Sequence, residues 1–539
     1  MTTHAEADAR TPAFTPHEPS ARHVGGVGGW LTRHALHQPD TDALVFAGQR
    51  FTYRELNNRV DRLANALTDR GIGFGDRVSG VLLNSNAFLE TLFACAKIGA
   101  IFVPINFRLS PEEVTFILAD SRARVVVYHP RMVPLIEPGR ATTSLEHGIC
   151  VTDGADSGPA MTGDRDYEEV LEGSAMNPRD VYIEQDDAHV MMYTSGTTGQ
   201  PKGAVLSHGN TTWNAVNTTL SDLAIGRDDV VLTVAPMFHI GGLSVHTLPA
   251  LYHGTTVILQ PAFDPTTLLA ELERERVTTL FLVPAMWQAL TQVPEFDNYD
   301  LSALRSLISG GAPCPIPAIE FFQSRGLRFQ EGFGLTETAP SVCALGNEDA
   351  VRKNGSVGKP LMHVQMRIVD DNDDDVAPGE VGELLVRGPN VFLGYWNRPE
   401  ATAEALRGGW FHTGDLAAQD DEGFYYIVDR KKDMLISGGE NVYPTEVEQV
   451  LYRHPKIREV AVIGVPDERW GEVPVAVVAP EGEAPTLEDI QDYCSDRLAR
   501  FKTPKDLIIV EALPRNATGK VLKRELRQDH ANSPAHRPQ

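Results

Sequence analysis

A stretch of ten residues near the middle of the chain combines small, hydroxylated and basic side chains. It spans residues 194–203 and reads TSGTTGQPKG. Glycines let backbone N–H groups approach an anion, hydroxyls donate hydrogen bonds, and Lys202 supplies a positive charge. This combination predicts a phosphate-binding loop, with an ordinary surface turn as the alternative. The residues of the predicted loop are Thr194, Ser195, Gly196, Thr197, Thr198, Gly199 and Lys202.

The loop differs from two better-defined motifs. A Walker loop has Gly before its lysine and Ser or Thr after it, whereas Lys202 lies between Pro201 and Gly203. The chain contains no G-x-S-x-G sequence, so Ser195 is a poor candidate for an acyl nucleophile. What the loop binds is therefore indicated by the rest of the chain.

Length and composition limit the kind of protein that carries this loop. The 539 residues are expected to form two or more domains. A net charge of −25 argues against a nucleic-acid-binding protein, although a local anion site can still be positive. The five cysteines are scattered without a zinc-type cluster, which favours reduced thiols in a cytoplasmic protein. No apolar run approaches the roughly 20 residues that span a bilayer, and the N-terminus does not resemble a signal peptide.

Helical and strand patterns alternate from about residue 28. The segment that ends near Gly71 has a helical apolar face, made of Leu56, Val60, Leu63, Ala64 and Leu67. Short runs rich in β-branched residues are expected to be strands, at residues 76–84, 123–129, 230–236, 254–260, 278–284 and 304–311. Strands that alternate with helices predict parallel-rich sheets covered by helices.

The pattern changes after about residue 360. Residues 364–388 are expected to form hairpin-rich β-structure, with the acidic run 370–375 as a solvated turn. Beyond residue 444, helical and strand patterns alternate again. This predicts a small α/β domain after a polar junction at residues 429–433.

Further motifs follow the loop in order. They are PMFHIGG (236–242), SGGAP (309–313), GFGLTET (332–338), WFHTGD (410–415), IVDRKKDMLISGGENVYPTEVE (427–448) and PRNATGK (514–520). Together with YTSGTTGQPKG they resemble the motifs of the adenylate-forming superfamily. That superfamily includes acyl-CoA synthetases, aryl-CoA ligases, luciferases and nonribosomal peptide adenylation domains. The resemblance covers about residues 28–530.

The resemblance implies a two-step ligase that uses ATP, Mg²⁺ and coenzyme A. A carboxylate attacks the α-phosphorus of ATP to give acyl-AMP and pyrophosphate, and a thiol then displaces AMP. The implied fold is α/β, with a large N-terminal domain of parallel-rich β-sheets flanked by helices, a β-rich subdomain, and a small mobile C-terminal α/β domain. The expected parts are a disordered tail (1–27), the large domain (28–430), a hinge (431–433), the small domain (434–530) and a second disordered tail (531–539).

The resemblance also implies roles around the nucleotide. Glu337 binds Mg²⁺, a hard cation that prefers oxygen ligands, and Thr336 hydrogen-bonds the α-phosphate. Asp415 accepts hydrogen bonds from the ribose hydroxyls, with support from Arg430. Lys520 bridges the carboxylate and the α-phosphate as negative charge builds. The expected catalytic residues are Lys520, Thr194, Lys202, Glu337 and His239. Further nucleotide contacts are expected from Gly310, Gly311, Ala312, Gly332, Phe333, Gly334 and Ile427.

One nucleotide-binding position departs from the usual pattern. Phe333 stands where relatives often carry tyrosine. The change keeps a ring against adenine and removes a phenolic hydrogen bond.

The acid and the thiol are expected at two other groups of residues. The acyl pocket is expected at His239, Ile240, Gly241, Gly311 and Gly334. The tunnel for the pantetheine arm is expected at Gly438, Gly439 and Glu440, where a side chain at Gly439 would obstruct the arm. Lys432 falls at the hinge about which the small domain rotates between the half-reactions. Ile436 stands where some relatives carry a lysine that aids the thiol step, so no such lysine is assigned.

The acid itself is indicated only as a class. Sequences such as GGWLTRHALHQPD and GYWNRPEAT look most like fatty-acyl-CoA ligases, and aryl-CoA ligases share much of this pattern. No aspartate follows FHIGG to pair with an amino group, which disfavours amino acids. A medium- or long-chain fatty acid or another bulky apolar acid is expected, with an aryl acid as the alternative. A free-standing acyl carrier protein as the acceptor, a homodimer, a non-catalytic nucleotide-binding protein and a luciferase-like activity are further alternatives.

Overall fold

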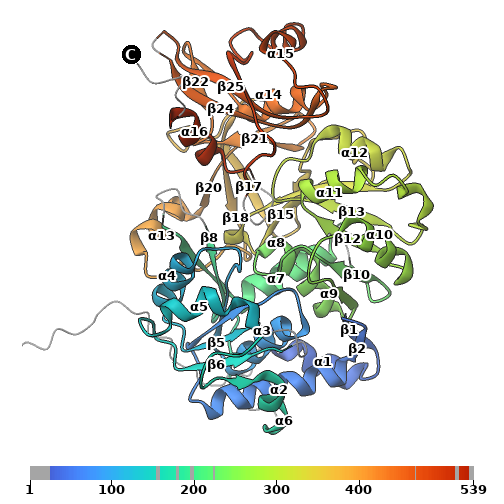
Figure 1. Ribbon diagram of the computed structural model, residues 1–539, viewed down its shortest axis with the longest axis vertical. Coiled ribbons are helices and arrows are strands. Elements are labelled where there is room, and N and C mark those ends of the chain that lie inside the picture. Colours follow the sequence, from blue (N-terminus) through green and yellow to red (C-terminus); the bar gives the residue numbers. More distant parts are fainter. Residues whose placement is uncertain are drawn as a thin grey trace, which may run out of the picture.

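The structure is a computed structural model that describes residues 25–152, 158–177, 181–194, 200–221, 225–467, 469–515 and 521–532. Two large sheets and a four-stranded sheet form the N-terminal part, and a five-stranded sheet forms the C-terminal part (Figure 1). The predicted α/β class with a large N-terminal and a smaller C-terminal domain is confirmed. Most of the two predicted tails, residues 1–24 and 533–539, lies outside the described residues.

The first large sheet carries the predicted phosphate loop at one end of a strand. Its strand order is β19-β9-β8-β4-β3-β5-β6-β7, with parallel pairing from β8 to β7 and antiparallel pairing of β8 with β9 and of β9 with β19. The strands are β3 (Arg77–Val81), β4 (Ile101–Pro104), β5 (Val125–Tyr128), β6 (His147–Cys150), β7 (Arg165–Asp166), β8 (Ala188–Thr194), β9 (Lys202–Ser207) and β19 (Gly394–Tyr395). The helices in this part are α1 (Gly29–His37), α2 (Tyr53–Asp69), α3 (Asn86–Ile98), α4 (Pro111–Ser121), α5 (Val133–Arg140) and α6 (Tyr167–Glu172).

The second large sheet has the order β16-β15-β14-β13-β12-β10-β11-β1-β2 and is parallel from β14 to β1. Its strands are β1 (Asp42–Phe46), β2 (Gln49–Thr52), β10 (Val230–Thr233), β11 (Thr256–Leu259), β12 (Thr279–Leu282), β13 (Ser306–Ser309), β14 (Phe329–Gly334), β15 (Ser341–Ala344) and β16 (Lys359–Pro360). The helices are α7 (His208–Thr219), α8 (Ile240–Gly242), α9 (Leu248–His253), α10 (Pro265–Arg274), α11 (Pro284–Thr291) and α12 (Ile316–Gln323). Each strand predicted between residues 230 and 311 is found here as one of β10 to β13.

The apolar face predicted before Gly71 belongs to α2 and is buried. Thr52 and Glu55 form a reciprocal capping box at its start, which satisfies N–H groups that a helix otherwise leaves unpaired. Gly71 follows the helix with φ of +77°, a left-handed conformation that glycine adopts without strain. Side chains of the face with almost no exposure are Leu56, Val60, Leu63, Ala64 and Leu67.

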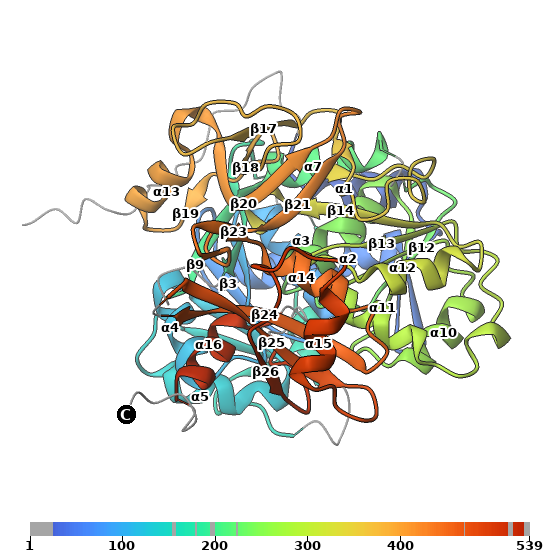
Figure 2. The same ribbon diagram turned by 90° about the horizontal axis from the view of Figure 1, so that it is seen from above.

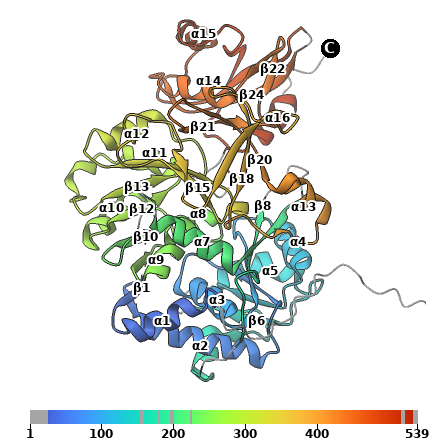
Figure 3. The same ribbon diagram turned by 180° about the vertical axis from the view of Figure 1, so that it is seen from behind.

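The β-rich segment after residue 360 forms an antiparallel sheet between the two large sheets and the C-terminal domain, as Figure 3 shows from behind. Its strands are β17 (Gln365–Val369), β18 (Gly382–Arg387), β20 (Phe411–Gln419) and β21 (Tyr425–Arg430), and α13 (Pro399–Ala405) lies between β18 and β20 in sequence. The predicted hairpin is β17–β18, and residues 370–375 lie in its connection. Three carboxylates of this exposed run also pair with basic residues: Asp371 with Lys431, Asp373 with Arg407, and Asp375 with Arg367.

The C-terminal domain covers the top of the molecule in Figure 1 and lies over the N-terminal sheets in Figure 2. Its elements are β22 (Leu435–Ser437), β23 (Glu440–Val442), α14 (Pro444–Leu451), β24 (Ile457–Asp467), β25 (Gly471–Pro480), α15 (Leu487–Cys494), β26 (Asp506–Ile509) and α16 (Lys523–Asn532). Gln449 on α14 donates a hydrogen bond to the carbonyl of Cys314, which precedes α12, at 3.3 Å. Arg453, which follows α14, also lies 3.7 Å from Glu320 of α12, so α14 and the residues after it contact the α12 region of the large domain. Among the described helices, none combines the length and apolar character needed to cross a bilayer.

Candidate active site

A cavity of about 350 Å³ lies at the carboxyl ends of the parallel strands β10, β12 and β13. Residues of β8, β9, β14, β15, β19, β20 and β21 and of the turn after β14 also line it. Open parallel sheets bind ligands beyond the carboxyl ends of their strands, so this is the expected place for a site. The predicted residues in the wall are Thr194, Lys202, His239, Ile240, Gly241, Gly310, Gly311, Gly332, Phe333, Gly334, Thr336, Glu337 and Arg430.

The two ends of the predicted phosphate loop are fixed by strand pairing. Thr194 ends β8 and Lys202 begins β9, and the two residues are cross-strand partners in the antiparallel pair. These two ends of the β8–β9 hairpin both belong to the cavity wall. The remaining predicted loop residues lie outside the described residues: Ser195, Gly196, Thr197, Thr198 and Gly199.

Glu337 lies beside this hairpin with only 8% of its surface exposed. Tyr395 donates a hydrogen bond from its hydroxyl to Glu337 Oε1 at 2.9 Å. Burial raises the pKa of Glu337, and this hydrogen bond opposes the shift by stabilising the carboxylate. Tyr395 also presents its ring to Lys202, whose Nζ lies 5.2 Å from the ring centroid.

The surroundings of Glu337 fit Mg²⁺ held together with phosphates. No group of three or more acidic, histidine or cysteine side chains that could hold a metal occurs in the described part of the chain. Mg²⁺ is commonly bound by one or two carboxylates, substrate phosphates and water rather than by a complete protein cage. A single buried carboxylate facing a phosphate-type hairpin therefore suits Mg²⁺ brought in by ATP.

Another part of the cavity wall is formed by glycines and by Arg430, which pairs with Asp415. A Cβ atom added at Gly310 would lie 3.3 Å from the Gly332 carbonyl oxygen, so bare backbone forms this wall. Asp415 is 3% exposed and forms an ion pair with Arg430, in which Asp415 Oδ1 lies 2.8 Å from Arg430 Nε. These two residues face each other across the β20–β21 pair. Asp415, Ala312 and Ile427 are not part of the cavity wall, although Asp415 is bonded to the wall residue Arg430.

The apolar end of the cavity is formed by the segment after β10 and by β12. A Cβ atom added at Gly241 would lie 3.2 Å from the ring of Phe281, and one at Gly310 would lie 3.3 Å from the same ring. Phe281 therefore packs against two positions that have no side chain. Burial lowers the pKa of His239 to about 3, so this histidine is neutral at pH 7. Other apolar residues at this end are Ala235, Val245, Val283 and Ile308.

The described residues predicted to act from the C-terminal side are not part of the cavity wall, namely Lys432, Gly438, Gly439 and Glu440. Gly438 and Gly439 form the tight turn between β22 and β23 with φ of +62° and +89°, and Glu440 begins β23. A Cβ atom added at Gly439 would meet no atom within 4 Å. Lys432 follows β21 at the start of the C-terminal domain. Lys520 lies outside the described residues.

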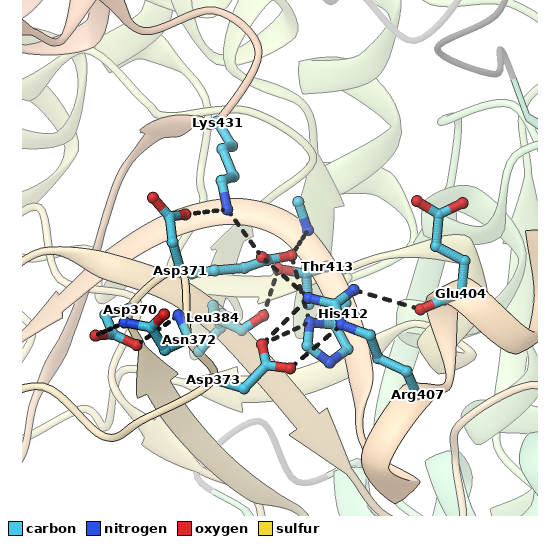
Figure 4. A network of polar contacts seen from close by, with 12 residues as sticks. Asp370, Asp371, Asn372, Asp373, Leu384, Glu404, Arg407, His412, Thr413 and Lys431 are labelled. Carbon is cyan, nitrogen blue, oxygen red and sulfur yellow. Dashed lines mark hydrogen bonds and ion pairs between the residues drawn. The ribbon is translucent and has the colours of Figure 1, made fainter.

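A polar network joins the acidic turn to the segment before Lys432 (Figure 4). Lys431 Nζ lies 2.8 Å from Asp371 Oδ1 and 3.4 Å from Glu383 Oε2. The backbone N–H of Lys431 donates to the carbonyl of Gly414, one residue before Asp415. The network therefore fixes Lys431, the first residue of the predicted hinge.

Several wall residues were not predicted from the sequence. Phe281 lies within an apolar strand and has the sequence signature of a core residue. Tyr395 belongs to GYWNRPEAT, a motif that supported the resemblance to the family but whose residues were given no chemical role. His412 and Thr413 lie within WFHTGD, next to the predicted Asp415. For Tyr395, His412 and Thr413, membership of these motifs was the one sequence feature that pointed to the site.

Comparison with known proteins decides the family. The AMP-binding enzyme profile matches residues 31–396, and the profile of the AMP-binding enzyme C-terminal domain matches residues 446–520. The chain belongs to the AMP-binding enzyme family. Its relatives are acyl- and aryl-CoA ligases, so this protein is an ATP-dependent, AMP-forming acid–thiol ligase that uses Mg²⁺ and coenzyme A.

Three curated relatives cover nearly the whole chain. A feruloyl-CoA synthase from Amycolatopsis sp is 44% identical over 504 residues, 93% of this chain and 99% of the relative. An indoleacetate–CoA ligase from Aromatoleum aromaticum is 43% identical over 93% of this chain and 97% of the relative. The long-chain-fatty-acid–CoA ligase FadD13 from Mycobacterium tuberculosis is 40% identical over 93% of this chain and 98% of the relative.

Two solved structures show the same fold. The anthranilate CoA ligase AuaEII in complex with anthranoyl-AMP has a TM-score of 0.88 at 29% identity, covering 94% of this chain and 97% of that one. The second is the o-succinylbenzoate coenzyme A synthetase MenE from Bacillus subtilis, in complex with ATP and magnesium ion. It has a TM-score of 0.82 at 33% identity, and the match covers 92% of this chain and 99% of that one.

Proposed function

We propose that this ligase activates an aromatic carboxylic acid with a short side chain, through an aryl-AMP, and transfers it to coenzyme A. The observation that carries the proposal is the apolar end of the cavity, where Phe281 closes the space in front of Gly241 and Gly310. A flat ring can pack against a phenylalanine edge or face, which favours aromatic over aliphatic ligands by about 0.5–1.5 kcal/mol. Relatives named for feruloyl-CoA and indoleacetate support the same class.

The charge distribution of the cavity supports one orientation of the acid. The charged groups of the wall are Lys202 at the start of β9, Glu337 in the turn after β14, and Arg430 at the end of β21. Phe281 and Val283 form an uncharged end of the cavity. An apolar acid therefore gains most by placing its ring at Phe281 and its carboxylate toward the phosphates. His239 is neutral, so it can act as a hydrogen-bonding group at the pocket mouth without attracting a second carboxylate.

In the first half-reaction a carboxylate oxygen forms a bond to the α-phosphorus, and the bond to the pyrophosphate oxygen breaks. Thr194 and Lys202 hold the β- and γ-phosphates, and Thr336 orients the α-phosphate. Glu337 holds Mg²⁺, which neutralises charge on the phosphate oxygens when bound. Lys520 stabilises the charge that builds between carboxylate and phosphate.

In the second half-reaction the thiol of coenzyme A attacks the acyl carbonyl carbon and AMP leaves. We assign the hinge to residues 431–433, with the domains at 28–430 and 434–530. Rotation about Lys432 would exchange Lys520 for the Gly438–Glu440 turn at the cavity. Support for this comes from the open space beside Gly439, where an added Cβ atom would meet no atom within 4 Å and a substrate arm has room to pass.

A fatty acid is the second candidate, because FadD13 is 40% identical to this chain. In that case affinity would rise with chain length by about 0.8 kcal/mol per buried methylene. A carrier-protein acceptor, a homodimer and a cytoplasmic location stay predictions from the sequence.

The test is thioester formation with ATP, Mg²⁺ and coenzyme A across a matched panel of acids. Ferulate, 4-coumarate, indoleacetate and anthranilate represent aryl acids, and octanoate and palmitate represent fatty acids. We expect the highest kcat/KM for one of the aryl acids. A palmitate value above every aryl value would replace this proposal by the second candidate.

A further inference from the structure

The hydroxyl and the ring of Tyr395 contact two different charged groups of the cavity. The hydroxyl donates to Glu337 Oε1 at 2.9 Å, and the ring centroid lies 5.2 Å from Lys202 Nζ. Tyr395 is itself half-buried, and burial raises the pKa of its phenol, so it remains a donor at neutral pH. A phenol thus stands between the carboxylate and the ammonium group.

The backbone holds Tyr395 in this place. As part of β19 it pairs with Ala204 of β9, two residues after Lys202, so the two side chains share one strand pair. Its N–H donates to the hydroxyl of Thr402 at 2.9 Å, and Phe392 packs edge-on against its ring.

The same segment also holds the backbone of Glu337. The N–H of Phe392 donates to the carbonyl of Glu337 at 2.9 Å. The segment from Phe392 to Tyr395 therefore fixes Glu337 at both its main chain and its side chain.

Lys202 and Glu337 form no direct ion pair in the described structure, although both face the same cavity. Oppositely charged side chains in a partly desolvated cavity attract each other strongly. If they paired, the lysine would be less available to phosphate and the carboxylate less available to a cation. A group that accepts the ammonium on its face and donates to the carboxylate from its hydroxyl keeps them apart.

We propose that Tyr395 is a positioning residue that holds Lys202 and Glu337 apart and directs them to the triphosphate and its Mg²⁺. The inference rests on the proposed function in one respect, namely that MgATP is the ligand of this side of the cavity. The hydroxyl fixes one oxygen of Glu337 and leaves the other for the metal. The ring keeps Lys202 extended toward the phosphates.

Two variants separate the two parts of the residue. Tyr395→Phe removes the hydroxyl and keeps the ring, and Tyr395→Leu removes both. Both measurements are made without a carboxylic acid. Electron paramagnetic resonance gives the affinity of Mn²⁺ for the complex of the protein with a non-hydrolysable ATP analogue. Calorimetry gives the affinity of the protein for the same analogue in the absence of metal. Tyr167→Phe is the matched control, because the Tyr167 hydroxyl donates to the buried carboxylate of Glu90 at 2.6 Å.

We expect Tyr395→Phe to weaken Mn²⁺ binding about tenfold, as for loss of a hydrogen bond to a charged group, with metal-free nucleotide binding within about twofold of wild type. Tyr395→Leu is expected to weaken metal-free binding as well, by about tenfold, because Lys202 then pairs with Glu337. Adding Glu337→Gln to Tyr395→Leu removes the competing charge and is expected to restore metal-free nucleotide binding. Structural damage alone would not be repaired by a second substitution.

Unchanged Mn²⁺ affinity in Tyr395→Phe would overturn the role of the hydroxyl. An equal loss in Tyr167→Phe, or a loss in Tyr395→Leu that Glu337→Gln does not restore, would overturn the positioning role. These binding results are independent of the acid panel. An enzyme inactive with every aryl acid would refute the proposed substrate class while leaving the Tyr395 result intact.

Discussion

The ring of Phe281 is predicted to set the depth of the acyl pocket, and Phe281→Ala tests this directly. The ring has 6% exposure and approaches positions 241 and 310 so closely that added Cβ atoms would lie 3.2 and 3.3 Å from it. Its removal opens the far end of the cavity toward β12. The aryl acid then loses its ring contact, which is worth about 0.5–1.5 kcal/mol and corresponds to a kcat/KM lower by about two- to thirteenfold.

Straight-chain acids should respond in the opposite direction. Each methylene that enters the opened space contributes about 0.8 kcal/mol, or about fourfold in kcat/KM. Across hexanoate, octanoate and decanoate, the variant should therefore show a steeper rise with chain length than wild type. The assay is coenzyme A thioester formation at saturating ATP, with kcat/KM determined for each acid.

Two matched measurements make the outcome interpretable. Gly241→Ala adds a methyl group against the same ring and should lower kcat/KM for bulky acids instead of extending the chain-length range. Removing a buried phenylalanine costs about 3–5 kcal/mol of stability, so thermal unfolding of Phe281→Ala must be measured first. Phe281→Leu replaces it if the alanine variant does not fold. A folded variant with the wild-type ranking of acids would refute the assigned pocket depth.

Three further predictions concern the nucleotide, the half-reactions and acid stability. Asp415→Asn should raise the KM for ATP about tenfold through weaker ribose binding and a weaker pair with Arg430, and an unchanged KM would contradict the ribose role. Lys520→Ala should abolish aryl-AMP formation, while thioester formation from supplied aryl-AMP persists. Gly439→Leu should keep aryl-AMP formation and lose thioester formation. Loss of both steps in either folded variant would contradict the assigned roles. His189 is fully buried and stacks on buried His208 at 4.7 Å, and burial lowers its pKa from 6.5 to about 3. Below pH 6.5 the unfolded state therefore binds the proton that the native state excludes, which removes about 1.4 kcal/mol of stability per pH unit down to about pH 3. Urea unfolding at pH 7.5 and 5.5 should show this loss reduced in His189→Leu, and an equal loss in wild type and variant would refute it.

Local patterns and ordered motifs were sufficient to predict much of the architecture. The apolar face of α2 follows a 3.6-residue period, and Thr52 and Glu55 have the spacing of a capping box, so this helix is determined locally. The strands at residues 230–311 are short β-branched runs, and the cavity at their carboxyl ends follows from the parallel topology.

Residues whose role depends on distant partners could not be found in this way. Phe281 reads as an ordinary core residue, and only the missing side chains at Gly241 and Gly310 place its ring in the cavity wall. Tyr395 is far from Lys202 and Glu337 in sequence, and the pairing of β19 with β9 brings them together. The Lys431–Asp371 pair likewise depends on how the β17–β18 connection folds toward β21.

The most direct test of the account is a crystal structure with a non-hydrolysable aryl-adenylate, the sulfamoyl analogue of feruloyl-AMP. The aryl ring is predicted to lie against Phe281 and Val283, with the adenine beside Phe333 and the ribose at Asp415. An aryl group bound outside the wall formed by Phe281, or an adenosine bound away from β13 and β14, would contradict it.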